Sequence, residues 1–296
     1  MKKGFLKFFV VVLTVCFMLG CIPANAASER VISSEKVLVD EYEYITSIQK
    51  MSKNELKEMG YSDSVAEEML AFSYREALYE RAKLPESSLK NLGYSDRQIE
   101  FMKDFLADPD GDYDFSVLAI SLSSSIVLVS GANSSVSKTV RYQWSWSASP
   151  LVLGNDSAGV RWQGFDRNGH SVDMTSYESG RYGSVNYYND YGFMKTENLT
   201  IKSASGFNSL NASFRMKTIS NGENLWAKSG SITCKLDKPS SGNAIEYIKF
   251  QGTYGHATIN PGTLSVDYSG TVGLSFSWGC ENYYKTAEIR SSVVYI

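Results

Sequence analysis

Histidine and cysteine are scarce in this sequence. There are two histidines and four cysteines in 296 residues, and no HExxH, nucleophile-elbow, phosphate-loop or paired CxxC pattern is present. Beyond residue 26 the zinc-binding residue types are His170, His256, Cys234 and Cys280, and none of them are paired at ligand spacing. We therefore expect no metal, no cofactor and no catalytic residues, and an enzyme is the less favoured class.

Carboxylates brought together from distant strands are the enzymatic alternative that remains, because glycosidases use such pairs. Asp166, Asp173 and Glu178 are the nearest candidates. Acidic side chains in loops are, however, usually solvated. A hydrolase is therefore the third of the functions that we consider.

Long apolar runs are absent beyond the N-terminal region, so no later segment approaches the ~18 apolar residues of a membrane-spanning helix. At the start of the chain, three lysines precede an apolar run over residues 8–19, and "ANA" at residues 24–26 has the pattern of a signal-peptidase site. We expect residues 1–26 to be a signal peptide and the rest to be secreted and extracellular. Attachment to lipid through Cys21 is the alternative.

Two cysteines remain after the predicted cleavage. Cys234 and Cys280 are the thiols of an exported chain, and such a pair most simply forms a disulfide bond. Closing that loop would stabilise the fold by roughly 4 kcal/mol. The alternative is a pair of buried free cysteines in strands.

Charge is distributed unevenly along the chain. Residues 27–114 hold 11 Lys/Arg against 20 Asp/Glu, whereas residues 115–296 hold 15 against 12. A strongly acidic segment followed by a mildly basic one argues against nucleic acid as a partner. The asymmetry favours intramolecular packing of the first segment on the second.

An eight-residue motif occurs twice in the acidic segment. "LKEMGYSD" begins at Leu56 and "LKNLGYSD" begins 33 residues later. In each copy a glycine suits the left-handed position after a helix, and a serine then caps the next helix. In the second copy Ser95 and Gln98 form a capping box. Residues 27–107 are therefore predicted to form a helical module of about four helices.

An aspartate-rich stretch, "DPDGDYD" at residues 108–114, follows the helical module. Its first three aspartates have the spacing of a calcium loop, but Tyr113 stands where the glycine belongs and Ala119 where the glutamate belongs. Proline, glycine and carboxylates are also typical of a solvated linker. We interpret the stretch as a linker.

The hydrophobic period changes from helical to two after residue 115. Val140, Tyr142, Trp144 and Trp146 alternate with Thr139, Arg141, Gln143 and Ser145. About ten such runs separated by Ser, Gly and Asn turns predict an antiparallel β-sandwich over residues 115–296. The fold class is thus α+β, a small N-terminal helical module followed by an all-β antiparallel sandwich.

Residues 263–278 have the most regular alternation of apolar and Ser/Thr positions. They form either one long strand or a hairpin whose turn keeps the apolar residues on one face. The same pattern is typical of a half-buried sandwich strand and of the membrane-crossing hairpin of a pore former.

Aromatic residues gather in the β region, which holds all five tryptophans. The tryptophans are suited to a core, whereas the tyrosines lie beside glycine and asparagine, as loop residues do. Aromatic rings of this kind can contact sugars or a membrane interface. The candidate contact surface comprises Tyr182, Tyr187, Tyr188, Tyr191, Tyr283 and Tyr284.

The layout resembles that of exported Gram-positive proteins of the large geobacillin-type bacteriocin group. The resemblance rests on "LGYSDRQIEFM", "QWSWSASP", "VRWQG", "WAKSG" and "TYGHATI". It implies an antimicrobial activity but no particular site residues. Our first hypothesis is a non-catalytic protein that acts at a cell surface or membrane, and our second is a carbohydrate- or cell-wall-binding module.

Overall fold

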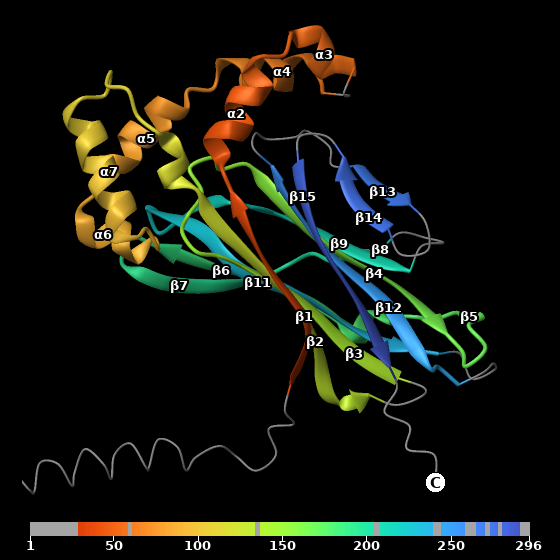
Figure 1. Cartoon of the computed structure of the whole chain (residues 1–296). Coiled ribbons are helices and arrows are strands. Elements are labelled where there is room, and N and C mark those ends of the chain that lie inside the picture. Colours follow the sequence, from red (N-terminus) through yellow and green to blue (C-terminus); the bar gives the residue numbers. More distant parts are fainter. Residues whose placement is uncertain are drawn as a thin grey trace, which may run out of the picture.

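Two antiparallel β-sheets pack face to face, and a group of helices covers one end of them (Figure 1). The computed structural model describes residues 29–58, 61–133, 137–203, 208–238, 244–257, 265–269, 273–277 and 280–290, and only the backbone for 130–133 and from 257 onward. The predicted signal peptide and Cys21 lie outside this range. The mixed α+β class with a sandwich-like sheet arrangement is confirmed.

The first sheet has the order β1-β2-β3-β11-β6-β7, with β10 beside β11. Its strands are β1 Arg30–Val39, β2 Ile120–Asn133, β3 Ser137–Trp146, β6 Arg181–Asn189, β7 Gly192–Asn198, β10 Lys217–Ser220 and β11 Glu223–Asp237. The second sheet has the order β15-β12-β4-β9-β8, with β5 beside β4. Its strands are β4 Asn155–Phe165, β5 Ser171–Val172, β8 Lys202–Ser203, β9 Ser209–Arg215, β12 Tyr247–Ala257 and β15 Cys280–Arg290.

A separate hairpin is formed by β13 Ser265–Ser269 and β14 Gly273–Ser277. Val266 is opposite Phe276, and Tyr268 is opposite Leu274. Of the two forms expected for residues 263–278, the hairpin with apolar positions opposite one another is the one observed.

The helices lie between β1 and the rest of the first sheet in the sequence. They are α2 Glu41–Gln49, α3 Lys53–Glu58, α4 Asp63–Ala71, α5 Tyr74–Ala82, α6 Glu86–Asn91 and α7 Asp96–Ala107, followed by the short 3-10 helix η1 Phe115–Leu118. The prediction of a helical module over residues 27–107 is therefore wrong at its start. Residues 30–39 are a strand whose partner, β2, is some ninety residues away in the sequence, and local periodicity does not reveal such a pairing.

The second copy of the repeated motif ends α6 as predicted. Gly93 has φ +97°, its N–H donates to Lys90 O, and Tyr94 N–H donates to Leu89 O. These two bonds satisfy carbonyls that the helix end would otherwise leave unpaired. In the first copy, Tyr61 N–H makes the equivalent bond to Leu56 O.

Capping follows the sequence closely. Ser95 and Gln98 form the predicted capping box at the start of α7. Ser62 caps α4 by accepting a bond from Val65 N–H, and no glutamine side chain is present there to return it. Each such cap stabilises a helix by about 1 kcal/mol.

The hydrophobic core is continuous from the sandwich into the helices. One cluster of buried residues includes Tyr74, Leu78 and Phe105 of the helices together with Trp144 and Trp146 of the sandwich. A second, smaller cluster joins the end of α2 to α3 and α4. Because α5 and α7 share the main core, they and the sandwich fold as one packed unit.

Cys234 is a buried free thiol, so the predicted disulfide with Cys280 is not found. Cys234 lies opposite Val140 in the first sheet, whereas Cys280 lies opposite Ala257 in the second. Trp146, six residues beyond Val140 on β3, packs on the residue before Ala257. Six residues of strand span about 20 Å, which separates the two cysteines far beyond bonding reach.

The aspartate-rich stretch connects α7 to η1. Arg75 of α5 donates to the carbonyls of Pro109 and Gly111. Asp114 caps η1 through Ser116 N–H. None of the helices in the part of the chain that the structure describes is both long enough and apolar enough to span a bilayer.

Candidate functional site

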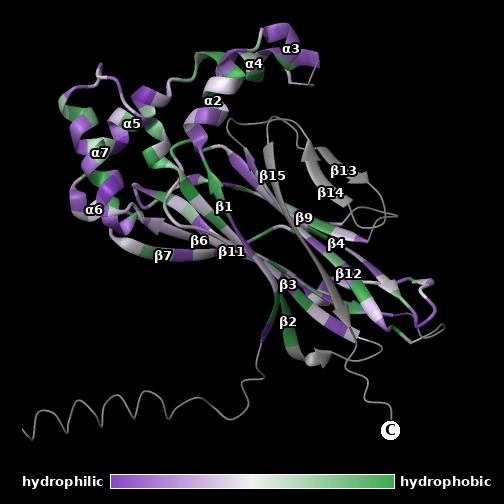
Figure 2. Cartoon of the chain, viewed as in Figure 1, coloured by the Kyte–Doolittle hydropathy of each residue, from purple (hydrophilic) through white to green (hydrophobic). Residues whose placement is uncertain are grey.

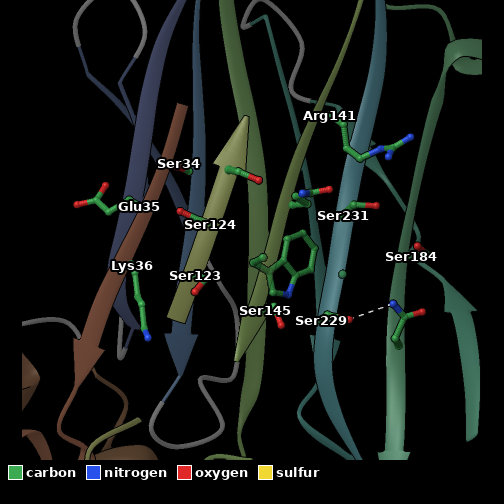
Figure 3. Close-up of a pocket in the computed structure, with 15 residues that line it drawn as sticks. Ser34, Glu35, Lys36, Ser123, Ser124, Arg141, Ser145, Ser184, Ser229 and Ser231 are labelled. Carbon is green, nitrogen blue, oxygen red and sulfur yellow. Dashed lines mark hydrogen bonds between the residues drawn. The ribbon is translucent and has the colours of Figure 1, made fainter. Parts of the chain in front are cut away.

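A hollow of about 660 Å³ lies on the outer face of the first sheet. We call it the polar groove. It is lined by Ser34, Glu35, Lys36, Ser123, Ser124, Ser125, Arg141, Gln143, Trp144, Ser145, Ser184, Asn186, Ser229, Gly230 and Ser231. Figure 3 shows the labelled side chains spread over several neighbouring strands.

Strand alternation explains why this face is polar. Along β3, Tyr142 and Trp144 are buried in the core, and Gln143 and Ser145 point outward. The same alternation of hydrophilic and hydrophobic residues is visible along the sheet in Figure 2. The buried ring of Tyr142 lies against the backbone of Gly252 on β12, where an added Cβ would be 2.0 Å from the ring. The inward residues thus fix the register that places hydroxyl and amide groups outside.

The register aligns these side chains in rows across the sheet. One row is Lys36, Ser123, Ser145, Ser229, Asn186 and Thr196. The next row is Ser34, Ser125, Gln143, Ser231, Ser184 and Asn198. Neighbours within a row are about 4.8 Å apart. The groove floor is therefore a regular lattice of hydrogen-bonding groups.

Two tyrosines flank this lattice along β6. Tyr182 and Tyr188 share the outward parity of Ser184 and Asn186. Tyr182 is 53% exposed. Tyr188 is half-buried: its ring packs against Phe193 at 5.5 Å. Their separation of six positions places the two rings about 20 Å apart along the strand.

The remaining predicted tyrosines do not join this surface. Tyr187 is buried and its hydroxyl donates to Arg215 O; burial raises the pKa of that hydroxyl. Tyr191 is 78% exposed but lies in the β6–β7 turn. Tyr283 and Tyr284 belong to β15, whose side chains lie outside the described part of the chain. The prediction of one surface was therefore wrong for Tyr187, because strand alternation sends it to the opposite face from Tyr188.

Arg141 is a cation of the groove. Its Nε donates to Thr233 Oγ1 at 3.2 Å, and its Nη1 lies 2.9 Å from Glu29 Oε1. Lys36 stands at the other side, on the exposed edge strand β1. Arg141 is not among the site residues predicted from sequence, although its place among alternating apolar residues indicates that it faces outward.

A second polar cluster is buried between α2 and the sandwich. His256 Nδ1 lies 3.0 Å from Asp156 Oδ2, and His256 Nε2 lies 3.7 Å from Glu41 Oε1. Tyr254 hydroxyl donates to Asp156 and accepts from Trp146 Nε1. No local signal in the sequence predicted the cluster, because the His256 and Asp156 strands pair over a separation of about one hundred residues.

Burial alone would lower the pKa of His256, but the charge and hydrogen bond of Asp156, reinforced by Glu41, raise it to about 10. His256 and Asp156 are fully buried and Glu41 nearly so. The cluster therefore ties α2 to the sandwich and is closed to solvent. Within the described ranges, no three His, Cys, Asp or Glu side chains are arranged to hold a metal ion.

The three candidate carboxylates differ in their burial. Asp166 is buried and accepts hydrogen bonds from Asn168 N–H and His170 N–H, which shapes its own loop. Asp173 and Glu178 are exposed.

Comparison with known proteins identifies no family. No protein family model matches the sequence, and no curated protein matches it. Among solved structures, AvmM, which catalyses macrocyclization in alchivemycin A biosynthesis, has 6% identity and a TM-score of 0.24, with 55% of this chain and 85% of that chain covered. A structure concerned with pH-induced modulation of Streptococcus parasanguinis adhesion by Fap1 fimbriae has 11% identity and a TM-score of 0.23, with 58% and 80% covered. Neither likeness bears on function.

Proposed function

We propose that this chain is a secreted glycan-binding protein that holds a polysaccharide in the polar groove. The observation that carries the proposal is the set of Ser, Thr, Asn and Gln rows across six strands, with Tyr182 and Tyr188 beyond them on β6. Sugars present many hydroxyl groups and apolar ring faces. A lattice of donors and acceptors next to aromatic rings complements both.

The groove is poorly suited to other ligands. Small apolar molecules bind in enclosed pockets lined mainly by hydrophobic side chains, whereas this lining is mostly serine and other polar groups. A single-stranded nucleic acid needs a strongly basic groove. Here the acid Glu35 lies beside Lys36, and Glu29 neutralises Arg141.

Binding to a panel of polysaccharides and to bacterial cell walls tests the proposal. Sedimentation with insoluble glycans and affinity electrophoresis with soluble ones would measure it. We expect Tyr182→Ala to weaken binding roughly tenfold, as loss of one stacking ring does. Tyr191→Ala is the matched control, since it removes an exposed tyrosine near the same strand but outside the groove. No binding to any glycan, or equal losses in both variants, would refute the proposal.

Action at a membrane, as in a bacteriocin-like toxin, is the second candidate. The β13–β14 hairpin supports it, because apolar residues lie opposite one another along it and alternate with serines and aspartate. Dye release from lipid vesicles tests this candidate. Leakage that disappears on Phe276→Ser would favour it over glycan binding.

A further inference from the structure

Arg141 is fixed in place at one end of the polar groove. Its Nε is held by Thr233 Oγ1, which orients the guanidinium plane. Its Nη1 lies 2.9 Å from Glu29 Oε1 and 3.1 Å from Glu29 Oε2. An arginine whose one edge is already hydrogen-bonded presents its other edge in a defined direction, and a carboxylate is the group that fits there.

Glu29 can leave this position without disturbing the fold. The first paired residue of β1 is Arg30, so Glu29 precedes the ladder. Its side chain is 46% exposed. An exposed ion pair of this kind changes an equilibrium by no more than about a factor of five. A carboxylate on a ligand could therefore replace that of Glu29 at small cost.

Tyr182 stands in the same row as Arg141. Arg141 is opposite Thr233 on β11, and Thr233 is opposite Tyr182 on β6. Two strand spacings place the two residues about 10 Å apart. A cation for a carboxylate and an exposed aromatic ring for a sugar face thus lie in one row across the sheet, with Arg141 in the groove lining and Tyr182 beyond it.

We propose that the groove selects glycans that carry carboxylates, the uronic acid class, and that Arg141 is the residue that recognises the carboxylate. In the free protein the Glu29 carboxylate occupies the position of the ligand's carboxylate. It therefore competes with the ligand for Arg141 and lowers the apparent affinity. This inference rests on the proposed glycan binding and adds its specificity. A carboxylate is favoured over a phosphate because a carboxylate already occupies the position.

The experiment compares binding of the purified chain to polygalacturonate and hyaluronate with binding to neutral dextran and xylan at low salt. Arg141→Gln should lose about tenfold or more in affinity for the acidic polymers and little for the neutral ones. Glu29→Gln should bind the acidic polymers about two- to fivefold more tightly. Lys202→Gln is the control, because it removes an exposed charge from β8 of the second sheet, outside the groove.

The outcomes distinguish failure of carboxylate selection from failure of glycan binding itself. Equal affinity for acidic and neutral glycans, or equal losses in Arg141→Gln and Lys202→Gln, would overturn carboxylate selection and leave glycan binding intact. Preference for a teichoic-acid-type phosphate polymer would overturn the carboxylate assignment. Failure to bind any glycan would overturn the proposed function itself. If Arg141→Gln folds poorly, Glu29→Gln still tests the proposal, because an unchanged or weakened affinity for the acidic polymers contradicts competition by Glu29.

Discussion

Glu41 and Arg81 hold opposite polar groups of the same loop. The carboxylate of Glu41 accepts hydrogen bonds from the backbone N–H groups of residues 151 and 152. The guanidinium of Arg81 donates to the carbonyls of residues 149 and 150. Both side chains are buried. The loop between β3 and β4 is therefore hydrogen-bonded to an acid of α2 and to a base of α5, and these bonds join the helices to the sandwich.

Removing either partner should destabilise the whole molecule. Glu41→Ala leaves two buried N–H groups without their acceptor and removes the carboxylate that lies 3.7 Å from His256 Nε2. Arg81→Ala removes the donor to the Pro150 carbonyl and to the Tyr94 hydroxyl. We expect losses of about 3–5 kcal/mol in the free energy of unfolding, measured by urea denaturation. Glu43→Ala, an exposed acid on the same helix, should cost less than about 0.5 kcal/mol. A similarly small loss in the free energy of unfolding for Glu41→Ala would show that the loop does not depend on these hydrogen bonds.

His256 should make stability depend on pH in the alkaline range. Its pKa is raised from 6.5 to about 10 in the folded state, so the unfolded state binds fewer protons than the folded state between these values. The stabilisation is fully present below about pH 6.5 and is lost as the pH rises towards 10. Since a tenfold difference in proton affinity is about 1.4 kcal/mol, the full effect amounts to a few kcal/mol.

His256→Gln provides the comparison, because it should remove that alkaline loss. The groups that face His256 are Asp156, Glu41 and the ring of Trp146. Lys138 has the opposite effect. Burial lowers its pKa to about 8, so its contribution to the free energy of unfolding increases as the pH rises above that value. The difference between wild type and variant, followed by urea denaturation from pH 6 to 10, isolates the histidine. Parallel curves for the two proteins would contradict a charged His256.

Gly93 is required by both its conformation and its contacts. Its φ is +97°, and an added Cβ would lie 2.2 Å from Ser147 O. Gly93→Ala should therefore strain the helix end and push the joint away from the sandwich, costing about 2–4 kcal/mol more than the backbone penalty alone. Gly169 also has a positive φ, but nothing lies within 4 Å of its Cβ position. Gly169→Ala should cost about 1 kcal/mol. Equal thermal shifts in the two variants would show that contact with Ser147 is unimportant.

The sequence predicted those features that depend on neighbours along the chain. The helix joint at Gly93, the capping box at Ser95 and the alternation along β3 all follow from residues within a few positions of one another. Local chemistry alone decides such features, so they can be derived without the fold.

Features built from distant segments were missed. The β1 strand takes its conformation from pairing with β2, and the contact between His256 and Asp156 joins two strands of the second sheet. The groove became visible only when the register placed residues of six strands in one row. For the same reason the disulfide was mispredicted, since nothing in the spacing of two cysteines reveals which end of a sheet each occupies.

The state of Cys234 can be measured directly. Its thiol is fully buried and donates to Val140 O, and burial raises its pKa. Because only the thiolate reacts readily, Cys234 should resist alkylation by iodoacetamide in the native protein and react fully in denaturant without any reductant. Mass spectrometry of the digested protein would locate the label. A peptide in which Cys234 is linked to Cys280, or alkylation that requires prior reduction, would contradict the free thiol and restore the disulfide between the two ends of the sandwich.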